Sequence, residues 1–418
     1  MSAEQNGVDY DVVIIGGGPA GAVAAAGLVR EGRKVAVFEK ETFPRFVIGE
    51  SLLPSSNDIL SRVGLYDAVA DAKFLKKEGA LFFMDGKIER FNFAETSAGG
   101  WDFAYQVPRA DFDSVLINKA ASMGADVTFG AAVTGVAFDD DTVTLTVRQG
   151  QVDRTVTGKW LIDCSGYGRA LASNLDLDAP STLPVREALF THITGDRRPA
   201  GSDEGYIWIV VLPQGGWIWV IPFSDGRTSV GVVAEPSLFV SDTESDAQLL
   251  TRLLTQEPCL AERLGDMRFV METRRIKGYS VGIKSLHGPR YLLTGNATEF
   301  LDPVFSSGVT LAMESAHRAQ AMVNRALNGE TVDFDAEYDA YVMRGVNCFR
   351  SYVTSWYTGE LKSLFFNATK PEKIKRRVCS VLAGYVWDLN NPFAAQSGEA
   401  LAATFATIAD PRKGAVGG

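Results

Sequence analysis

The chain has 418 residues, of which 46% are hydrophobic and 22% charged, so it can bury a large core and form more than one domain. Its formal net charge of −10 argues against a phosphate backbone or an anionic membrane surface as the main partner, and we expect no binding to nucleic acid. The four cysteines form no CxxC pair and the three histidines are scattered, so we expect reduced thiols and no metal site.

The beginning of the chain contains no targeting pattern. Residues 1–11 lack a basic region followed by an apolar run, so we expect no signal peptide. No stretch reaches the roughly 18 uninterrupted apolar residues of a membrane span, which argues against stable membrane insertion. These features predict a cytoplasmic protein.

The first forty residues predict a strand, a tight turn, a helix and a second strand. Val12 to Ile15 is a continuous apolar run, as expected of a buried parallel strand. Pro19 to Arg30 is rich in alanine and predicts a helix, and Lys34 to Glu39 predicts the second strand. This order is typical of a dinucleotide-binding βαβ unit.

The turn in this unit, within VVIIGGGPAG, has the pattern GxGxxG. Gly16 permits the tight turn, Gly18 lets the backbone approach a pyrophosphate, and Gly21 lets the helix pack closely on the strand. The helix N-terminus offers free N–H groups and the positive end of a dipole to phosphates. Glu39 ends the second strand, where it can accept a hydrogen bond from a ribose hydroxyl. The alternative is a structural glycine-rich turn that binds no nucleotide.

Apolar patterns predict the elements that follow. We expect helices over Pro54–Val63, Ala110–Met123 and Val309–Leu327, strand-like segments between Gly79 and Val107, a β-meander over Val133–Val156, and short strands over Trp160–Asp163 and Tyr291–Thr294. The most β-rich part is Leu189–Glu235, where YIWIVVLP and WIWVIPF flank a glycine turn and predict an antiparallel hairpin.

FAD is favoured over NAD because a flavin extends far across a protein and needs contacts from distant segments. Arg109 in QVPRADFD, Asp163 to Gly166 in LIDCSG and Gly295-Asn296 after YLLT are candidates. With these segments the chain resembles the flavin monooxygenase superfamily of the p-hydroxybenzoate hydroxylase fold, where a DxxG segment approaches the nucleotide and a Gly-Asp holds the ribityl chain. Asn296 stands where that family has Asp, so it keeps an acceptor oxygen without the charge. No second GxGxxG follows a second strand, so we expect no NAD(P)H domain.

The resulting fold class is α/β: a Rossmann-like FAD-binding domain interleaved with a β-sheet substrate domain, then a helical C-terminal region. The expected FAD-binding domain is discontinuous and comprises residues 1–72, 101–185 and 281–330. The expected substrate domain comprises residues 73–100 and 186–280, and the helical region residues 331–418.

Within that superfamily, four segments resemble the flavin-dependent halogenases. Trp217 to Pro222 matches their WxWxIP signature, and Gly49 to Pro54 resembles their GES-containing loop beside the flavin. Asp302 to Gly308 resembles their DPxFSSG segment, and Phe74 to Gly79 resembles the stretch that carries their essential lysine. Tryptophan halogenases carry glutamate where this chain has Phe305, so the chain more closely resembles halogenases of phenolic, pyrrolic and carrier-protein-bound substrates.

The resemblance implies a catalytic lysine, a halide site, a substrate tunnel and an FAD site. Lys77 is the expected catalytic lysine with Lys76 as the alternative, because strand neighbours point to opposite faces and the spacing Phe-x-x-Lys-x-Gly favours Lys77. Halide would bind at Ser307 and Gly308, and Trp217, Trp219 and Phe305 would line the tunnel. The residues expected to hold FAD are Gly16, Gly18, Ala20, Gly21, Glu39, Lys40, Arg45, Glu50, Ser51, Arg109, Asp163, Gly166, Gly295, Asn296, Pro303, Gly308 and Val309.

Each of these segments also has a purely structural interpretation. The two lysines could be solvated surface charges, and the two tryptophans could form a core wall. Ser306-Ser307-Gly308 could be a helix cap, because serine is a preferred N-cap residue. The cations of Lys370 to Arg377 could form a solvated helix face or a docking patch for an acidic carrier protein.

The implied function is that of an FADH2-dependent halogenase acting on an electron-rich aromatic substrate. By resemblance, reduced FAD and O2 give a flavin hydroperoxide, chloride or bromide gives hypohalous acid, and a lysine positions that acid for the substrate. The expected partners are a separate flavin reductase and a small-molecule or carrier-protein-tethered substrate. The alternatives are a flavin-dependent hydroxylase, a geranylgeranyl-reductase-like oxidoreductase, and a noncatalytic FAD-binding relative.

Overall fold

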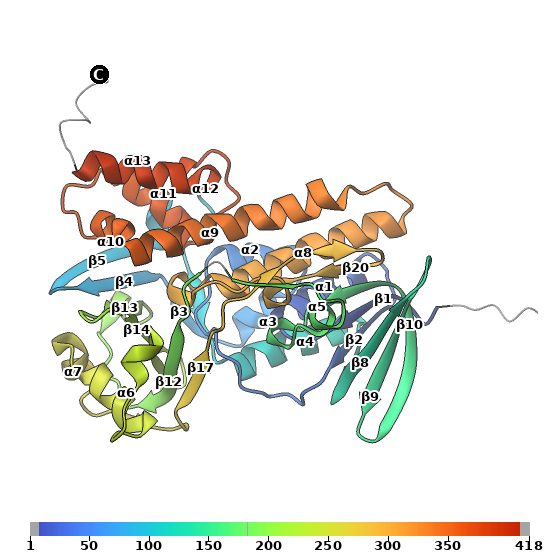
Figure 1. Ribbon diagram of the computed structural model, residues 1–418, viewed down its shortest axis with the longest axis horizontal. Helices are drawn as coiled ribbons and strands as arrows, with labels where there is room; N and C mark the ends of the chain where they lie inside the picture. The colour runs from blue at the N-terminus through green and yellow to red at the C-terminus, as the bar shows by residue number, and fades with distance from the viewer. Residues whose placement is uncertain (1–7, 182, 410–418) are drawn as a thin grey trace, which may run out of the picture.

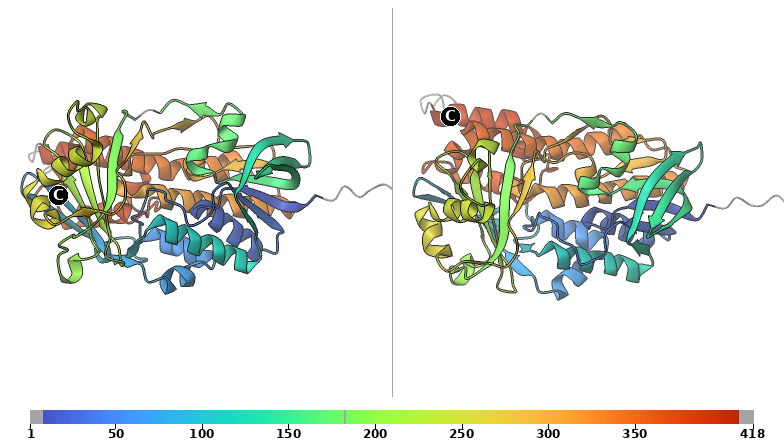
Figure 2. Two further views of the ribbon diagram at one scale, coloured as in Figure 1. Left: turned by 90° about the horizontal axis from the view of Figure 1, so that it is seen from below. Right: turned by 60° about the horizontal axis from the view of Figure 1, so that its bottom comes forward.

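The computed structural model describes residues 8–181 and 183–409, and the structural statements below refer to these residues. Two mixed sheets lie at opposite ends of the molecule, and long helices run between them (Figures 1 and 2). The architecture is therefore α/β, as the sequence predicts, and helices cover one side of the molecule in its C-terminal part (Figure 1).

The first sheet is built around the predicted βαβ unit. Strand β1 (Tyr10–Ile15) pairs in parallel with β2 (Val35–Glu39) and with β10 (Val152–Asp163). The strand order is β19-β20-β10-β1-β2-β7, with β19 at His287–Gly288, β20 at Tyr291–Leu293 and β7 at Asp126–Phe129. The apolar run of β1 is fully buried because helices cover one face of this sheet and the β-meander the other. The connecting helix α1 (Pro19–Arg30) has the predicted bounds.

The prediction of a separate short strand over Trp160–Asp163 is wrong. It is the end of the twelve-residue β10, which pairs antiparallel with β9 (Val143–Gln149) in its first half and parallel with β1 in its second half. Residues 152–155 are all exposed, burial alternates over residues 156–159, and residues 160–163 are all buried, so one strand carries several patterns. The meander continues into β8 (Ala131–Phe138).

The second sheet contains the predicted hairpin. Its order is β16-β12-β15-β14-β13-β4-β5, and β17 also pairs with β12. These strands span Arg268–Phe269 (β16), Glu187–Thr194 (β12), Thr228–Ala234 (β15), Trp217–Pro222 (β14), Ile207–Val211 (β13), Gly79–Met84 (β4), Lys87–Asn92 (β5) and Arg274–Lys277 (β17). Ile218 and Val220 of β14 point to one face, where they pack with leucines of α6 (Asp246–Thr255) and α7 (Pro258–Leu264). The neighbouring tryptophans consequently point to the opposite face.

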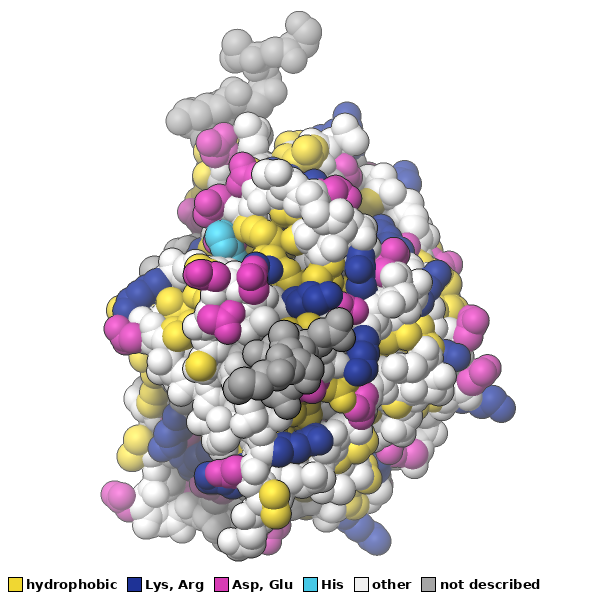
Figure 3. All heavy atoms as spheres, turned by 90° about the vertical axis from the view of Figure 1, so that its right-hand side faces the viewer, with side chains coloured by type: hydrophobic (Ala, Val, Ile, Leu, Met, Phe, Trp, Pro, Cys, Tyr) yellow, Lys and Arg dark blue, Asp and Glu magenta, His cyan; other side chains and the backbone are white. Residues whose placement is uncertain are grey.

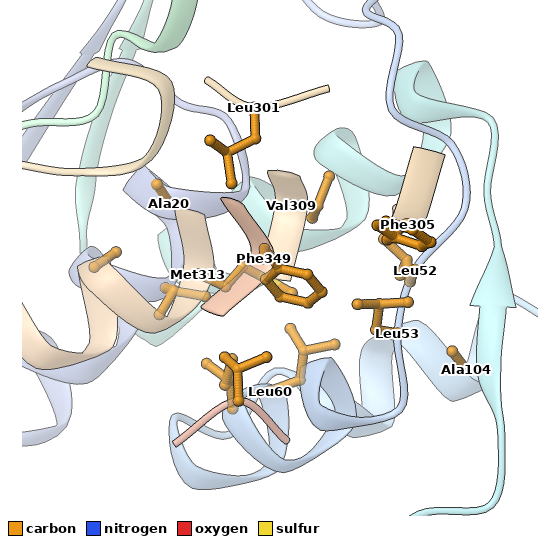
Figure 4. Packing of buried hydrophobic residues seen from close by; sticks show 14 of the residues in the cluster. Ala20, Leu52, Leu53, Leu60, Ala104, Leu301, Phe305, Val309, Met313 and Phe349 are labelled. Atoms are coloured by element: carbon orange, nitrogen blue, oxygen red, sulfur yellow. The ribbon is translucent and has the colours of Figure 1, made fainter. Parts of the chain in front are cut away.

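Long helices form the core between the sheets. Helix α8 (Ser307–Leu327) packs on α1 and on α9 (Ala340–Thr358), and α1 packs on α4 (Arg109–Met123). Val309 and Met313 of α8 share one hydrophobic cluster with Leu60 and Phe349 (Figure 4). The remaining helices and short strands are α2 (Ser55–Arg62), α3 (Tyr66–Asp71), β3 (Leu75–Lys77), β6 (Ala104–Gln106), α5 (Ala170–Asn174), β11 (Asp178–Ala179), β18 (Gly282–Ile283), α10 (Glu360–Phe365), α11 (Glu372–Leu382), α12 (Pro392–Ala395) and α13 (Ser397–Ala409).

Within the described ranges, none of the helices combines the length and apolar character needed to cross a membrane. On the face shown in Figure 3, basic and acidic side chains are interspersed. The net charge of −10 is therefore not gathered into one patch on this face.

Candidate active site

A cavity of about 570 Å³ extends from the glycine-rich turn to the apolar face of the second sheet. Its walls come from seven parts of the chain: residues 16–20, 39–51, 109, 164–168, 188–221, 274–279 and 294–312. This volume lies in the range of ordinary ligand and cofactor sites. Most of the residues predicted to hold FAD line this cavity: Gly16, Gly18, Ala20, Glu39, Lys40, Arg45, Glu50, Ser51, Arg109, Gly166, Gly295, Asn296, Pro303, Gly308 and Val309.

The three motif glycines have different roles in this geometry. Gly16 has φ +96°, and a Cβ there would lie 2.5 Å from the carbonyl oxygen of Cys164. A Cβ on Gly21, which does not line the cavity, would lie 1.9 Å from the carbonyl oxygen of Gly16. A Cβ on Gly18 would meet nothing closer than the Arg45 guanidinium at 3.4 Å. The fold therefore requires Gly16 and Gly21, whereas Gly18 keeps the cavity wall clear for a phosphate.

Glu39 is fixed at the end of β2 by two backbone groups. Its Oε2 accepts a hydrogen bond from Gly17 N at 2.8 Å, and its Oε1 accepts one from Glu41 N at 2.9 Å. Its side chain is 6% exposed, and the residue lines the cavity. Each oxygen keeps a lone pair, so Glu39 is able to accept from a ribose hydroxyl.

A buried aspartate that the sequence reasoning missed organises the two predicted arginines. Asp113 accepts two hydrogen bonds from Arg109, at 2.7 and 2.9 Å, and one from Arg45 at 2.8 Å. Arg109 also donates to the carbonyl oxygens of Ile48 and Gly49. Arg45 also lies 4.0 Å from Glu39, so two carboxylates hold the two guanidinium groups in place. The Arg45 guanidinium lies beside Gly18, where its N–H groups suit a pyrophosphate. The Arg109–Asp113 pair was predictable from the sequence, because Asp113 follows Arg109 by one helical turn.

Asp163 lies beneath the cavity and does not line it. Its two oxygens accept hydrogen bonds from Ser165 N and Leu171 N, both at 2.8 Å, and the side chain has no exposed surface. Burial raises its pKa. Asp163 thus shapes the loop whose residues Cys164 to Gly166 do line the cavity.

Asn296 is held by an arginine that sequence reasoning also missed. Gly295, with φ +53°, and Asn296 form a short turn that lines the cavity. The buried Arg169 donates hydrogen bonds to the carbonyl oxygens of Asn296, Ala297 and Thr298 at 3.0–3.3 Å. The turn is therefore fixed through its backbone.

The DPxFSSG segment ends at the start of α8. Ser306 occupies the N-cap position with φ +57°, and its side chain makes no cap hydrogen bond within the described residues. A serine thus occupies the N-cap position, but its hydroxyl does not cap the helix, and in this respect the serine-cap interpretation is wrong. Ser307 and Phe305 are buried and do not line the cavity, whereas Gly308 and Val309 do. The helix N-terminus still presents backbone N–H groups, which favour an anion.

Asp302 anchors this segment through a buried hydrogen-bond network. Tyr357 and Tyr279 donate to its Oδ2 at 2.7 and 3.1 Å, and Val304 N donates to Oδ1. Trp217 Nε1 donates to the Tyr357 hydroxyl at 3.3 Å. Helix α9 thereby connects the WxWxIP strand to the DPxFSSG turn.

The two tryptophans line the cavity from one face of β14. Trp217 and Trp219 are 2% and 5% exposed, and their ring centroids are 5.9 Å apart. A Cβ on Gly231 of the next strand would lie 2.3 Å from the Trp219 ring, so this glycine makes room for the indole. Phe190 packs against the same indole. These rings form the apolar wall of the cavity.

The adjacent lysines point to opposite faces, as expected. Lys76 is exposed and lies 4.2 Å over the Phe103 ring. Lys77 is 2% exposed, and its Nζ donates to the carbonyl oxygen of Leu52 at 2.9 Å. Among the described residues no carboxylate lies within ion-pair distance of Lys77 Nζ, and burial lowers the pKa of Lys77 to about 7. Neither lysine is one of the residues that line the cavity.

The cavity fits FAD on the evidence of its own wall. The Gly18 backbone is open toward it, two arginines flank that point, and the buried Glu50 Oε2 and Ser51 Oγ lack a hydrogen-bond partner in the described part of the chain. Buried polar atoms rarely stay unsatisfied, so these atoms favour a polar ligand. The rings of Phe190, Trp217 and Trp219, which line the cavity from the second sheet, suit a flavin ring system.

Comparison with known proteins agrees with this geometry. The family described as "FAD binding domain" matches residues 9–345. The chain is 30% identical to a 1H-pyrrole-2-carbonyl-[peptidyl-carrier protein] chlorinase of Pseudomonas fluorescens over 91% of this chain and 90% of that protein. A flavoprotein/dehydrogenase structure from Cytophaga hutchinsonii is 42% identical, with a TM-score of 0.93 over 96% of this chain and 99% of that one. The flavin-dependent brominase Bmp2 is 25% identical, with a TM-score of 0.84 over 97% and 99%.

Proposed function

The chain belongs to the flavin-dependent halogenase branch of the FAD-binding oxidoreductases, with FAD as its cofactor, and from this premise we propose that it halogenates an electron-rich aromatic substrate of the phenol or pyrrole type. The observation that carries the proposal is that Lys77 is buried and, among the described residues, has no counter-ion. A buried lysine without a counter-ion is costly to a fold, and such groups concentrate at functional sites.

Lys77 would act as the group that receives the electrophilic halogen. Bound FADH2 would supply two electrons and two protons to O2, so that halide, O2 and one further proton yield hypohalous acid and water. With a pKa near 7, much of Lys77 is a neutral amine that can hydrogen-bond the acid or react with it. Transfer of the halogen to an aromatic carbon then releases the carbon's proton, and water forms from the remaining hydroxyl group.

The other residues would position the reactants. Gly18, Arg45 and Arg109 would hold the pyrophosphate, and Asn296 would contact the ribityl chain. The backbone N–H groups at Ser307 and Gly308 would hold the halide at the helix N-terminus. Trp217 and Trp219 would separate substrate from flavin, and Phe305 would contact the substrate path.

A substrate tethered to a carrier protein is supported by the chlorinase relative, whose name specifies a carrier-bound pyrrole. Residues 370–377, the basic segment considered as a docking patch for such a partner, offer fewer free cations than the sequence indicated. Lys370 and Lys375 both pair with Glu89, at 2.7 and 3.1 Å, and Lys370 is largely buried. Lys373 and Arg376 of α11 are exposed and Arg377 is half-buried, and these are the cations of the segment available to an acidic carrier.

A rival function has one observation in its favour. The relative with 42% identity is described as a flavoprotein/dehydrogenase, which suits an FAD oxidoreductase that does not halogenate. The discriminating experiment supplies a flavin reductase, NADH, O2 and either chloride or bromide. A phenol, a free pyrrole and a carrier-protein thioester of pyrrole-2-carboxylate serve as substrates, and mass spectrometry reads the products. Halogenated product supports the proposal, whereas hydroxylated or reduced product would support the rival.

A further inference from the structure

The sheet face that walls the cavity carries a histidine. His192 lies two residues after Phe190 on β12, so both side chains project from the same face of the strand. On the neighbouring strand β15, His192 pairs with Ser229. Two residues further along β15, Gly231 pairs with both Phe190 of β12 and Trp219 of β14. His287 and His317, the other histidines of the chain, lie on β19 and α8. His192 is thus the imidazole that this apolar wall presents beside the cavity.

His192 is paired with Glu50 of the GES loop. Its Nε2 lies 2.7 Å from Glu50 Oε1, and the two side chains are 5% and 1% exposed. The rings of Phe46 and Phe223 pack edge-on against the imidazole, with centroids 5.6 and 5.3 Å away. In such apolar surroundings a hydrogen bond is strong and fixes the orientation of the carboxyl group.

The second oxygen of Glu50 is unsatisfied. Glu50 Oε2 is buried and finds no hydrogen-bond partner among the residues that the structure describes, and Glu50 lines the cavity. Its neighbour Ser51 lines the same wall with an equally unsatisfied hydroxyl. A single orphaned atom could reflect local packing, but two adjacent ones on a cavity wall point to a polar ligand that completes both.

We propose that His192 is a positioning residue that holds the Glu50 carboxylate toward bound FAD and thereby sets the reduction potential of the flavin. A fixed negative charge beside the flavin disfavours its electron-rich reduced state, and the effect is large where water is excluded. The proton of His192 Nε2 keeps one carboxylate oxygen in place, so that the other faces the cofactor. This inference rests on the FAD cofactor and is independent of whether the product is halogenated.

The test compares Glu50→Gln, His192→Leu, His192→Gln and the double variant Glu50→Gln/His192→Leu, with His287→Gln as the matched histidine control. The dissociation constant of FAD and the reduction potential of the bound flavin are measured without halide or substrate. Glu50→Gln should shift the potential to more positive values because it removes the charge. His192→Leu should shift the potential in the same direction, and the double variant should shift it no further. His192→Gln, whose amide can still donate to Glu50, should stay near the wild-type value, as should His287→Gln.

Other outcomes would overturn the proposal. An unchanged potential in Glu50→Gln would show that the flavin does not sense this charge, and additive shifts in the double variant would show that His192 does not act through Glu50. If His192→Leu fails to bind FAD, His192→Gln decides: restored binding supports positioning by the hydrogen bond, and continued loss contradicts it. Loss of FAD binding in Glu50→Gln would also contradict the proposal, since the amide keeps an acceptor oxygen.

Discussion

Lys77 Nζ donates a hydrogen bond to the carbonyl oxygen of Leu52, 2.9 Å away, and this bond ties a buried lysine to the loop that lines the cavity. Leu52 directly follows Ser51, which forms part of the cavity wall. The loop is held from its other side, where Leu52 N donates to the carbonyl oxygen of Tyr105. Lys77 therefore contacts the residue next to the cavity wall, and among the described residues its Nζ has no hydrogen bond to the glycine-rich turn.

Replacing Lys77 with Met should stabilise the fold in a pH-dependent way. Burial lowers the pKa of Lys77 to about 7, so between pH 7 and its ordinary pKa of 10.5 the unfolded chain binds a proton that the folded chain does not. The resulting penalty is fully present below pH 7 and disappears as the pH rises to 10.5. After the lost hydrogen bond to Leu52 is subtracted, Lys77→Met should gain about 1–3 kcal/mol at pH 7.

Urea unfolding followed by tryptophan fluorescence at pH 7 and pH 10 measures this gain. The gain should shrink markedly at pH 10. A gain of equal size at both pH values would mean that the lysine is charged in the folded protein.

Two glycine substitutions should separate cofactor binding from folding. The Cβ of a Gly18→Val variant has room in the protein, so the fold should persist while the side chain blocks the pyrophosphate. We expect the FAD dissociation constant to rise about ten- to a hundredfold. Gly21→Ala should instead lower the melting temperature, because its Cβ would lie 1.9 Å from the Gly16 carbonyl oxygen. Full FAD affinity in a folded Gly18→Val protein would contradict the assignment of this loop.

Local patterns in the sequence predicted much of the first sheet and the orientation of the lysines. The bounds of α1 follow from its alanine-rich run between two glycine-bearing turns. Strand alternation put Lys76 and Lys77 on opposite faces, and only the resemblance in spacing favoured Lys77, which is the buried one. The Glu50–His192 pair could not be predicted, because it joins residues 142 positions apart through the tertiary fold. The two pairing modes of β10 were missed for the same reason, since its partners lie in different parts of the chain.

Tyr357→Phe should weaken the network around Asp302. The substitution leaves Trp217 Nε1 without its partner and removes one donor from the Asp302 carboxyl group. We expect a loss of about 1–3 kcal/mol of unfolding free energy. Product formation should also fall, by about tenfold, as the turn before α8 shifts.

Tyr341→Phe is the matched control, because it removes a comparable hydrogen bond to Glu314 and neither residue lines the cavity. Thermal unfolding and product yield are measured for both variants. A drop in product formation of the same size in Tyr341→Phe would assign the effect to stability alone.

Reduction of the flavin should depend on a separate reductase. The sequence contains no second dinucleotide-binding motif, so NADH or NADPH alone should reduce bound FAD slowly. Anaerobic stopped-flow absorbance at the flavin band measures the rate with and without a flavin reductase. Rapid stoichiometric reduction by NADPH without the reductase would support a hydroxylase instead.

The central claim is halogenation through Lys77, and product analysis of two lysine variants tests it most directly. Wild type, Lys77→Met and Lys76→Ala are each supplied with FADH2, O2, bromide and an aromatic substrate that wild type converts. The products are identified and quantified by mass spectrometry. The account predicts that Lys77→Met binds and reoxidises FAD like wild type yet forms no halogenated product, while Lys76→Ala halogenates at a near wild-type rate. Halogenation by Lys77→Met at the wild-type rate would contradict it.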